Sequence, residues 1–264
     1  MPRFDANLSM MFTEVDFLDR FAAAAAAGFT GVEYLFPYDF AAADLAERLQ
    51  DHGLAQVLHN LPAGDWDAGD RGIAALPDRT EEFRAGVDRA IEYASALGCP
   101  QVNCLAGIAP DGADPARLRD TFVENLGYAA PRLKDAGIKL LIEPINTRDI
   151  PGFFLNRTDQ ATAIIDDVGS DNLFLQYDIY HMQVMEGDLA PTMEANLARI
   201  AHIQLADTPG RHEPGSGEIN FPFLFDFLDR IGYAGWIGCE YRPATTTTDG
   251  LGWFAPYAAR EAAA

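Results

Sequence analysis

Positive charge is scarce in this chain of 264 residues. Only 19 lysines and arginines stand against 40 aspartates and glutamates, which gives a formal net charge of −21. This charge disfavours a non-specific electrostatic grip on nucleic acid phosphates or on anionic lipid. We therefore expect neither nucleic acid nor a membrane as a partner, and any anionic substrate must be collected by local cations.

Cysteine and long apolar runs are also scarce. Cys99, Cys104 and Cys239 make an odd number without CxxC spacing, so we interpret them as core thiols and expect no disulfide. The opening MPRFDANLSMMF lacks a basic segment followed by a long apolar stretch, and no uninterrupted apolar run is long enough to span a bilayer. We expect a cytoplasmic protein.

Several catalytic motifs are missing from the sequence. There is no GxGxxG opening a strand and helix unit, no GxxxxGK, no GxSxG and no HExxH. The sequence therefore lacks the usual motifs for dinucleotide binding, for triphosphate binding, for serine hydrolases and for zinc proteases.

Strand-like and helix-like stretches alternate along the whole chain, which is typical of parallel α/β architecture. The expected strands are Phe4 to Met10, Gly31 to Phe36, Ala55 to His59, Gln101 to Leu105, Lys139 to Glu143, Leu173 to Asp178, Ile200 to Leu205 and Trp236 to Glu240. The expected helices are Glu14 to Ala27, Ala41 to His52, Arg79 to Leu97, Pro115 to Asp135, Thr158 to Val168, Leu189 to Arg199, Phe221 to Ile231 and Leu251 to Glu261. Because a (β/α)8 barrel has about 250 residues, we predict one such α/β barrel domain over residues 1–264, with two small domains as the numerical alternative.

Four of these strands end in side chains that carry oxygen. Glu143, Asp178, Gln204 and Glu240 end the runs KLLIE, LFLQYD, IAHIQ and WIGCE. In a closed parallel barrel all strand C-terminal ends point to the same face, so we expect these four side chains to converge. Three carboxylates and one amide oxygen suit a hard divalent cation such as Mg²⁺ or Mn²⁺ better than zinc. The sequence therefore predicts a metal site at one mouth of the barrel.

The two glutamates are also candidates for proton transfer. With a metal that polarises a carbonyl and its neighbouring oxygen, one of Glu143 and Glu240 can remove a carbon-bound proton while the other reprotonates. For either glutamate alone, a salt bridge that seals the mouth is the alternative. His181, three residues past Asp178, is expected to lie beside the metal, whereas His202 is expected one layer deeper.

Substrate contacts are predicted from polar residues near the same mouth. Arg211 lies in a glycine-rich stretch of an acidic protein, and a guanidinium suits a small carboxylate. Arg71 and Arg242 are weaker candidates for the same task. His59 ends a strand, and it either orients substrate or caps that strand, as do three further polar residues, Asn60, Glu33 and Asn103.

Two segments, 61–78 and 208–220, are too long and polar to be simple turns. Each follows the C-terminal end of an expected strand, where long loops of a barrel act as lids or substrate clamps. Mobile surface loops are the alternative, because glycine-rich loops are common.

Five segments carry further specific patterns: NLPAGDWDAGDRGI, IEPIN around Glu143, YDIYHMQ around Asp178, HIQLADTPGRHEPGSGEIN around Gln204 and GCEYRP around Glu240. Together they resemble the hydroxypyruvate isomerase family of xylose-isomerase-like barrels. The resemblance implies interconversion of hydroxypyruvate and tartronate semialdehyde, small anionic hydroxy-oxo acids, without an organic cofactor. It also implies that Glu143 and Glu240 are both the acid/base pair and metal ligands, with Asp178 and Gln204 completing the ligand set.

Other functions stay open at this point. A 2-oxo-tetronate isomerase has similar motifs, whereas the related ketose 3-epimerases place a histidine where this chain has Gln204. Metal-dependent apurinic endonucleases share the architecture, but the strand ends here are poor in histidine and the charge offers no phosphate track. A barrel that binds a small acid without turnover is a further alternative. Trp66 and the segment Trp253 to Tyr257 are candidates for a homo-oligomer interface.

Overall fold

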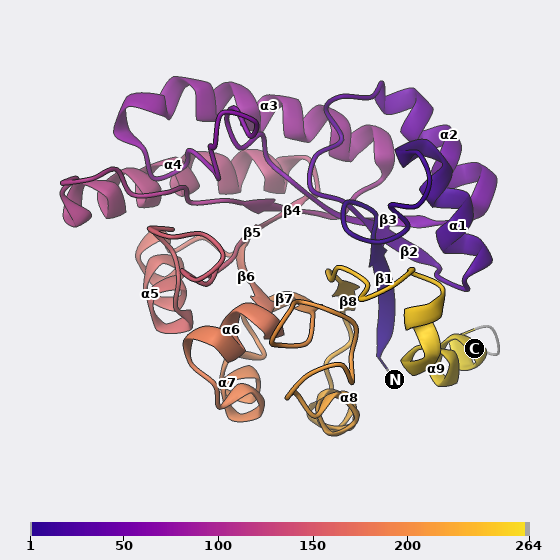
Figure 1. Cartoon of the computed structure of the whole chain (residues 1–264). Helices are drawn as coiled ribbons and strands as arrows, with labels where there is room; N and C mark the ends of the chain where they lie inside the picture. The colour runs from indigo at the N-terminus through magenta and orange to yellow at the C-terminus, as the bar shows by residue number, and fades with distance from the viewer. Residues whose placement is uncertain (1, 262–264) are drawn as a thin grey trace.

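The computed structural model describes residues 2–261 and contains a closed barrel of parallel strands that follow one another in chain order from β1 to β8 (Figure 1). The strands are β1 (Arg3–Asn7), β2 (Gly31–Glu33), β3 (Ala55–Asn60), β4 (Gln101–Cys104), β5 (Lys139–Ile142), β6 (Leu173–Asp178), β7 (Ile200–Leu205) and β8 (Trp236–Cys239). The predicted (β/α)8 barrel is thereby confirmed. All strand C-terminal ends meet at one mouth, because each strand runs parallel to both neighbours.

Helices surround the strands, with α3 and α4 along one side of the barrel and α5 to α8 along the opposite side (Figure 1). The helices are α1 (Arg20–Ala26), α2 (Ala42–His52), α3 (Thr80–Leu97), α4 (Pro115–Asp135), α5 (Thr158–Val168), α6 (Ile179–Met185), α7 (Leu189–Asn196), α8 (Phe221–Ile231) and α9 (Ala255–Glu261). The 3-10 helices are η1 (Phe17–Asp19), η2 (Pro77–Arg79) and η3 (Asp249–Trp253). Among residues 2–261, no helix has the length and apolar character needed to cross a membrane.

The first strand and the first helix are shorter than the sequence indicated. β1 ends at Asn7 rather than Met10, because Asn7 Oδ1 accepts a hydrogen bond from Ser9 N at 3.0 Å and Asn7 O accepts one from Met11 N at 2.8 Å. An asparagine that bonds the backbone two residues further on makes a turn, which competes with the strand. α6 was not expected, and it begins directly where β6 ends.

The helices bury one apolar face against the strands. In α8 the buried residues Phe221, Leu224, Phe225 and Leu228 recur at helical spacing. The side chain of Asn220 accepts from Phe223 N at 3.3 Å and so caps the first turn. Burying each of these large side chains contributes roughly 1.5–3 kcal/mol.

The C-terminal segment packs on its own barrel. The rings of Trp253 and Tyr257 each lie 5.2 Å from the ring of Phe4, and Phe225 lies 5.0 Å from it. These aromatic rings therefore have partners within the chain, so their presence in the sequence does not indicate an interface. A homo-oligomer stays a prediction.

The cysteines are core thiols, as expected. Cys99, Cys104 and Cys239 are free and buried. Burial raises the pKa of the Cys99 thiol to about 12 and also raises that of Cys104. A thiol with so high a pKa is a poor nucleophile.

Candidate active site

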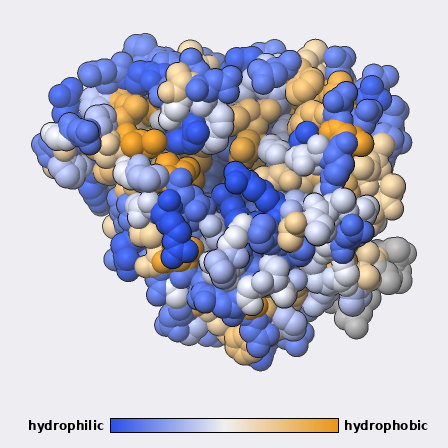
Figure 2. Space-filling model, in the orientation of Figure 1, coloured by the Kyte–Doolittle hydropathy of each residue, from blue (hydrophilic) through white to orange (hydrophobic). Residues whose placement is uncertain are grey.

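A cavity of about 1070 Å³ opens at the C-terminal mouth of the barrel. In the orientation of Figure 1, Figure 2 shows hydrophilic side chains beside a recess near the middle of this face. Every strand, or the segment directly after it, contributes to the lining: Asn7, Glu33, Asn60, Leu105, Glu143, Gln176, Gln204 and Glu240. Residues far apart in sequence therefore meet here, as the strand ends predicted.

Three carboxylates and one imidazole form a buried cluster in this mouth. Glu143, Asp178, His181 and Glu240 each place one potential ligand atom within 4.8 Å of the others. His181 Nε2 lies 3.5 Å from Asp178 Oδ2 and 3.9 Å from Glu143 Oε1. The structure thus brings together three of the four predicted metal ligands, and His181 beside them.

Asp178 uses its two oxygens differently. Oδ1 accepts hydrogen bonds from the backbone N of Tyr180 at 2.7 Å and of His181 at 3.4 Å, so it caps α6. The buried Oδ2 accepts no hydrogen bond from any described residue. A buried carboxylate oxygen of this kind needs a cation or a proton, which fits a metal centre at this point.

Gln204 lies next to this cluster in the barrel. On β7 it pairs with Asp178 on one side and Gly238 on the other, and it lines the cavity. Its Nε2 donates to Glu33 Oε1 at 2.7 Å, and its Oε1 accepts from Gln176 Nε2 at 2.6 Å. A carbonyl oxygen accepts twice, so Oε1 retains capacity for a ligand. Its role as a metal ligand stays a prediction.

Each of the two glutamates is held by an asparagine. Asn103 Nδ2 donates to Glu143 Oε2 at 2.9 Å, and Asn7 Nδ2 donates to Glu240 Oε1 at 3.3 Å. Sequence reasoning named Asn103 as a polar strand end. It missed Asn7, which it placed inside a longer strand.

The cluster raises the pKa of each carboxyl group. Burial and the nearby charges of Glu240 and Asp178 raise the pKa of Glu143 well above its ordinary value. Burial raises the pKa of Glu240 to about 8, against the lowering effect of Arg211, and raises that of Asp178 to about 6. Perturbed carboxyls in a cleft mark functional sites, and a bound cation would replace the protons they hold.

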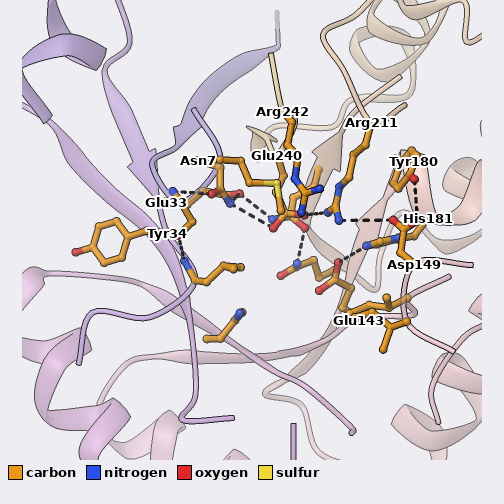
Figure 3. Close-up of a pocket in the computed structure, with 18 of the residues that line it drawn as sticks. Asn7, Glu33, Tyr34, Glu143, Asp149, Tyr180, His181, Arg211, Glu240 and Arg242 are labelled. Carbon is orange, nitrogen blue, oxygen red and sulfur yellow. Dashed lines mark hydrogen bonds and ion pairs between the residues drawn. The ribbon is translucent and has the colours of Figure 1, made fainter. Parts of the chain in front are cut away.

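Arg211 supplies positive charge to the cluster. Its guanidinium contacts the Glu240 carboxylate (Figure 3), and its NH2 lies 3.7 Å from Asp178 Oδ2. The guanidinium also lies 5.1 Å from the centre of the Tyr180 ring, and Tyr180 OH donates to Asp149 Oδ1 at 3.2 Å. Burial opposes its charge, but these carboxylates outweigh burial and raise the pKa of Arg211. Arg211 thus stays charged.

The loop that carries Arg211 is organised by one buried aspartate. Asp207 Oδ1 accepts from the backbone N of Thr208 and Ile219, and Oδ2 accepts from Gly215 and Gly217, at 2.9–3.0 Å. The segment 208–220 is therefore tied down rather than loose. Arg211 itself has a φ of 58°, an uncommon conformation for a residue other than glycine and one that concentrates at functional sites.

His181 is neutral and directs an N–H toward the cluster. Asn146 Oδ1 accepts from Asp149 N at 2.8 Å, so Asn146 Nδ2 faces His181 Nδ1 at 2.6 Å. Because an amide nitrogen only donates, Nδ1 accepts and the proton is on Nε2, which faces Glu143 and Asp178. Burial, with the charge of Arg211, lowers the pKa of His181 well below its usual value.

Arg71 and Arg242 both line the cavity, and their role in substrate binding stays a prediction. Arg71 stacks over the Trp66 ring at 4.1 Å and donates from NH1 to Trp66 O at 3.0 Å. The Trp66 ring in turn packs 5.0 Å from that of Phe36. Segment 61–78 therefore holds the Arg71 guanidinium in place at the mouth of the barrel.

The structure places His59 outside the cavity. The ring is fully buried, with Nδ1 at 3.0 Å from Asn60 O and 3.5 Å from Tyr38 OH, and only its neighbours Leu58 and Asn60 line the cavity. Alternation along β3 turns His59 toward the surrounding helices. The prediction that His59 contacts substrate is therefore wrong in its geometry.

Comparison with known proteins identifies close relatives. A family model described as xylose isomerase-like TIM barrel matches residues 21–257. Hydroxypyruvate isomerase of Escherichia coli strain K12 is 56% identical over 257 residues, which cover 97% of this chain and 100% of the relative. A 2-oxo-tetronate isomerase of Cupriavidus necator is 55% identical over 260 residues, which cover 98% of this chain and 100% of the relative.

Solved structures share the same fold. A Brucella melitensis crystal structure, described as AP endonuclease, family 2, has a TM-score of 0.96 at 50% identity and covers 97% of this chain and 99% of its own. A structure of L-ribulose 3-epimerase, at 24% identity, has a TM-score of 0.79 over 99% of this chain and 97% of its own, which shows a common fold. The chain therefore belongs to the hydroxypyruvate isomerase family of xylose isomerase-like TIM barrels.

Proposed function

We propose that this protein is a hydroxypyruvate isomerase, which interconverts hydroxypyruvate and 2-hydroxy-3-oxopropanoate. The observation that carries the proposal is the buried cluster, in which Glu143 and Glu240 lie with Asp178 and His181 within 4.8 Å. Identity of 56% to the Escherichia coli hydroxypyruvate isomerase supports the same substrate.

A divalent cation, Mg²⁺ or Mn²⁺, is proposed as the cofactor, and no organic cofactor is required. Glu143, Asp178, Gln204 and Glu240 would hold it, because they supply an all-oxygen donor set and Asp178 Oδ2 lacks a hydrogen-bond donor among the described residues. When bound, the cation polarises the substrate oxygens and so acidifies the neighbouring C–H bond.

The two glutamates move the proton between carbons. In hydroxypyruvate C2 is the carbonyl carbon and C3 carries the hydroxyl. One of Glu143 and Glu240 removes a proton from C3, which gives an enediolate, and the other delivers a proton to C2. The hydroxyl proton passes from O3 to O2, so product and substrate contain the same atoms. Neutral His181 donates its Nε2 proton in a hydrogen bond to a substrate oxygen.

Arg211 is proposed to bind the substrate carboxylate. Its guanidinium lies against the cluster, and its charge is maintained by Glu240 and Asp178. A guanidinium binds a planar carboxylate through two parallel hydrogen bonds. Arg71 and Arg242, further out, would collect the anion from solution against the net charge of −21.

Proton NMR of hydroxypyruvate in deuterated buffer tests this function. The metal-stripped protein is compared with and without Mg²⁺ or Mn²⁺, alongside Glu143→Gln and Glu240→Gln. We expect metal-dependent formation of 2-hydroxy-3-oxopropanoate with incorporated deuterium, lost in both variants. Neither conversion nor exchange in the metal-loaded wild type would remove hydroxypyruvate as the substrate.

A 2-oxo-tetronate isomerase is the second candidate. The Cupriavidus necator relative of that name is 55% identical, nearly the same value as the hydroxypyruvate isomerase. Both reactions need the same glutamate pair and metal, and they differ in the length of the substrate. The ratio of kcat/KM for hydroxypyruvate and for a 2-oxo-tetronate decides between them.

Two further alternatives receive less support. An endonuclease needs a basic track for phosphates, whereas this chain has a net charge of −21 and acidic groups in its mouth. A barrel that only binds a small acid does not need two glutamates that face one ligand position. Ketoses, the substrates of a ketose 3-epimerase, are tested in the same NMR assay. The cytoplasmic location stays a prediction.

A further inference from the structure

Glu33 is a buried carboxylate at the end of β2 that the proposed reaction does not use. It is 1% exposed, and three nitrogen-bearing side chains bind its oxygens. His202 Nε2 lies 2.7 Å from Oε2, while Gln204 Nε2 at 2.7 Å and Asn7 Nδ2 at 2.9 Å both donate to Oε1. Its neighbours therefore lie on β1 and β7, the strands that carry Asn7 and Gln204.

These hydrogen bonds fix the orientation of the Asn7 and Gln204 amides, that is, which side carries the NH2 and which the oxygen. Asn7 accepts from Ser9 N through Oδ1 and donates from Nδ2 to both Glu33 and Glu240. Gln204 donates from Nε2 to Glu33 and accepts through Oε1 from Gln176. Because a carboxylate accepts and an amide NH2 only donates, the NH2 of Gln204 must face Glu33. Its oxygen is then left on the other side of the amide.

Neighbouring positions of the barrel leave space for the Glu33 carboxylate and enclose it. Gly238 on β8 lies beside it, and a Cβ at that position would come within 2.5 Å of Glu33 Oε2. Below it, His202 fills the next layer of the interior and is fully buried. Figure 3 shows Glu33 next to Asn7, with Glu240 beyond Asn7.

We propose that Glu33 is a positioning residue for the metal centre, which fixes the amide of Gln204 so that its oxygen is available as a ligand. This inference rests on the proposed metal-dependent function. Glu33 also holds Asn7, which donates to Glu240, so one carboxylate orients groups on both sides of the site. Groups that orient a ligand typically affect metal affinity by about 10–100-fold.

Calorimetric titration of the metal-stripped protein with Mn²⁺ tests the proposal. Four proteins form a cycle: wild type, Glu33→Gln, Gln204→Ala and the double variant. Glu33→Gln keeps the shape of the side chain but lets the Gln204 amide rotate so that its oxygen and nitrogen exchange places. We therefore expect about 10–100-fold weaker Mn²⁺ binding. In the Gln204→Ala background the same change should alter the Kd by less than about threefold.

Asp5→Asn is the matched control, because Asp5 is a second buried acid in the group formed with Glu33 and His202 and lies on β1, two residues before Asn7. It removes a neighbouring buried acid, and we expect less than about a threefold change in the Mn²⁺ Kd. Thermal unfolding of each metal-free variant shows that it is folded. A variant that does not fold is replaced by Glu33→Asp, which keeps the acceptor but shortens its reach and should weaken Mn²⁺ binding less than Glu33→Gln.

The outcomes separate the two proposals. Wild-type Mn²⁺ affinity in Glu33→Gln would overturn the positioning role alone. An equal loss of Mn²⁺ affinity in the wild-type and Gln204→Ala backgrounds would also overturn it, because the effect would then come from the lost charge of Glu33. Failure of the wild type to bind Mn²⁺ would instead overturn the metal centre of the proposed function, and the positioning role with it.

Discussion

Asn103 donates from Nδ2 to Glu143 Oε2 over 2.9 Å, and the amide and the carboxylate are both buried. The bond fixes one oxygen of Glu143 and leaves Oε1 facing His181. Orientation of this glutamate is thus determined by a neighbouring strand rather than by solvent.

Asn103→Leu removes this donor. We expect kcat to fall about tenfold, and the loss of a hydrogen bond to a buried acceptor to cost about 1–3 kcal/mol of stability. Asn125→Leu is the control, because Asn125 is equally buried and donates from Nδ2 to Ala74 O at 2.8 Å away from the site. It should lower stability and leave kcat unchanged. Steady-state kinetics with thermal unfolding checks both, and equal kcat losses would contradict the orienting role.

Arg211→Met should weaken binding of the anionic substrate. Loss of charged hydrogen bonds worth about 1.5–3 kcal/mol corresponds to a decrease of roughly 10–100-fold in kcat/KM, mainly through KM. The kcat/KM of Arg211→Lys should lie between those of the wild type and Arg211→Met, because an ammonium keeps the charge but cannot form the paired contact. Arg199→Met, which removes an outer ion pair with Asp166, serves as the control. A KM unchanged from wild type would exclude Arg211 as the carboxylate site.

Metal affinity should increase with pH. Burial holds the pKa of Glu240 at about 8 and that of Asp178 at about 6 in the metal-free protein, so the cation must displace protons from them. We expect the Mn²⁺ Kd to decrease between pH 6 and 8 and then level off. Calorimetry in buffers of different ionisation enthalpy would report the released protons. A Kd independent of pH would contradict this.

The same raised pKa values predict how the metal-free protein responds to pH. Unfolded carboxyls lose their protons near 4.5 for Glu240 and 3.8 for Asp178, well below the folded values. The folded state therefore binds more protons in this window, and its stability falls as pH rises toward 8. Mn²⁺ should accordingly raise the Tm more at pH 8 than at pH 6. An equal increase at both pH values would argue against proton displacement.

Gly238→Ala should disturb Glu33. Its Cβ would approach the Glu33 carboxylate to 2.5 Å, so the carboxylate must move, at a cost of about 1–3 kcal/mol in stability, with weaker Mn²⁺ binding. Gly127→Ala, in the middle of α4 with open space around it, should instead stabilise by about 0.5–1 kcal/mol. Thermal unfolding and Mn²⁺ titration of both variants measure the contrast. Wild-type Mn²⁺ binding by Gly238→Ala would show that Glu33 tolerates the added methyl group.

The sequence predicted the barrel and the convergence of Glu143, Asp178 and Glu240 because strand ends have a fixed geometric meaning in parallel sheets. It did not predict which way His59 points. β3 has buried residues toward the barrel interior and toward the helices, so no polar and apolar alternation marks its two faces. Knowledge of the register is needed to assign them.

Asn7 and Asp207 were missed for a different reason. Their roles come from bonds to backbone groups and to side chains distant in sequence, such as Asn7 to Glu240. The only local signal was an asparagine two residues before a serine, which is compatible with a turn. Polar networks of this kind become visible once the strands are in register.

Asp178 has one oxygen on the start of α6 and the other beside His181 in the carboxylate cluster. On the proposed function, this position therefore has two independent roles, helix initiation and metal binding, and natural selection would act on both. A relative that loses isomerase activity would still be expected to keep the aspartate for its fold, while its two glutamates drift. For sorting active from inactive members of the family, the glutamate pair is thus the more informative marker.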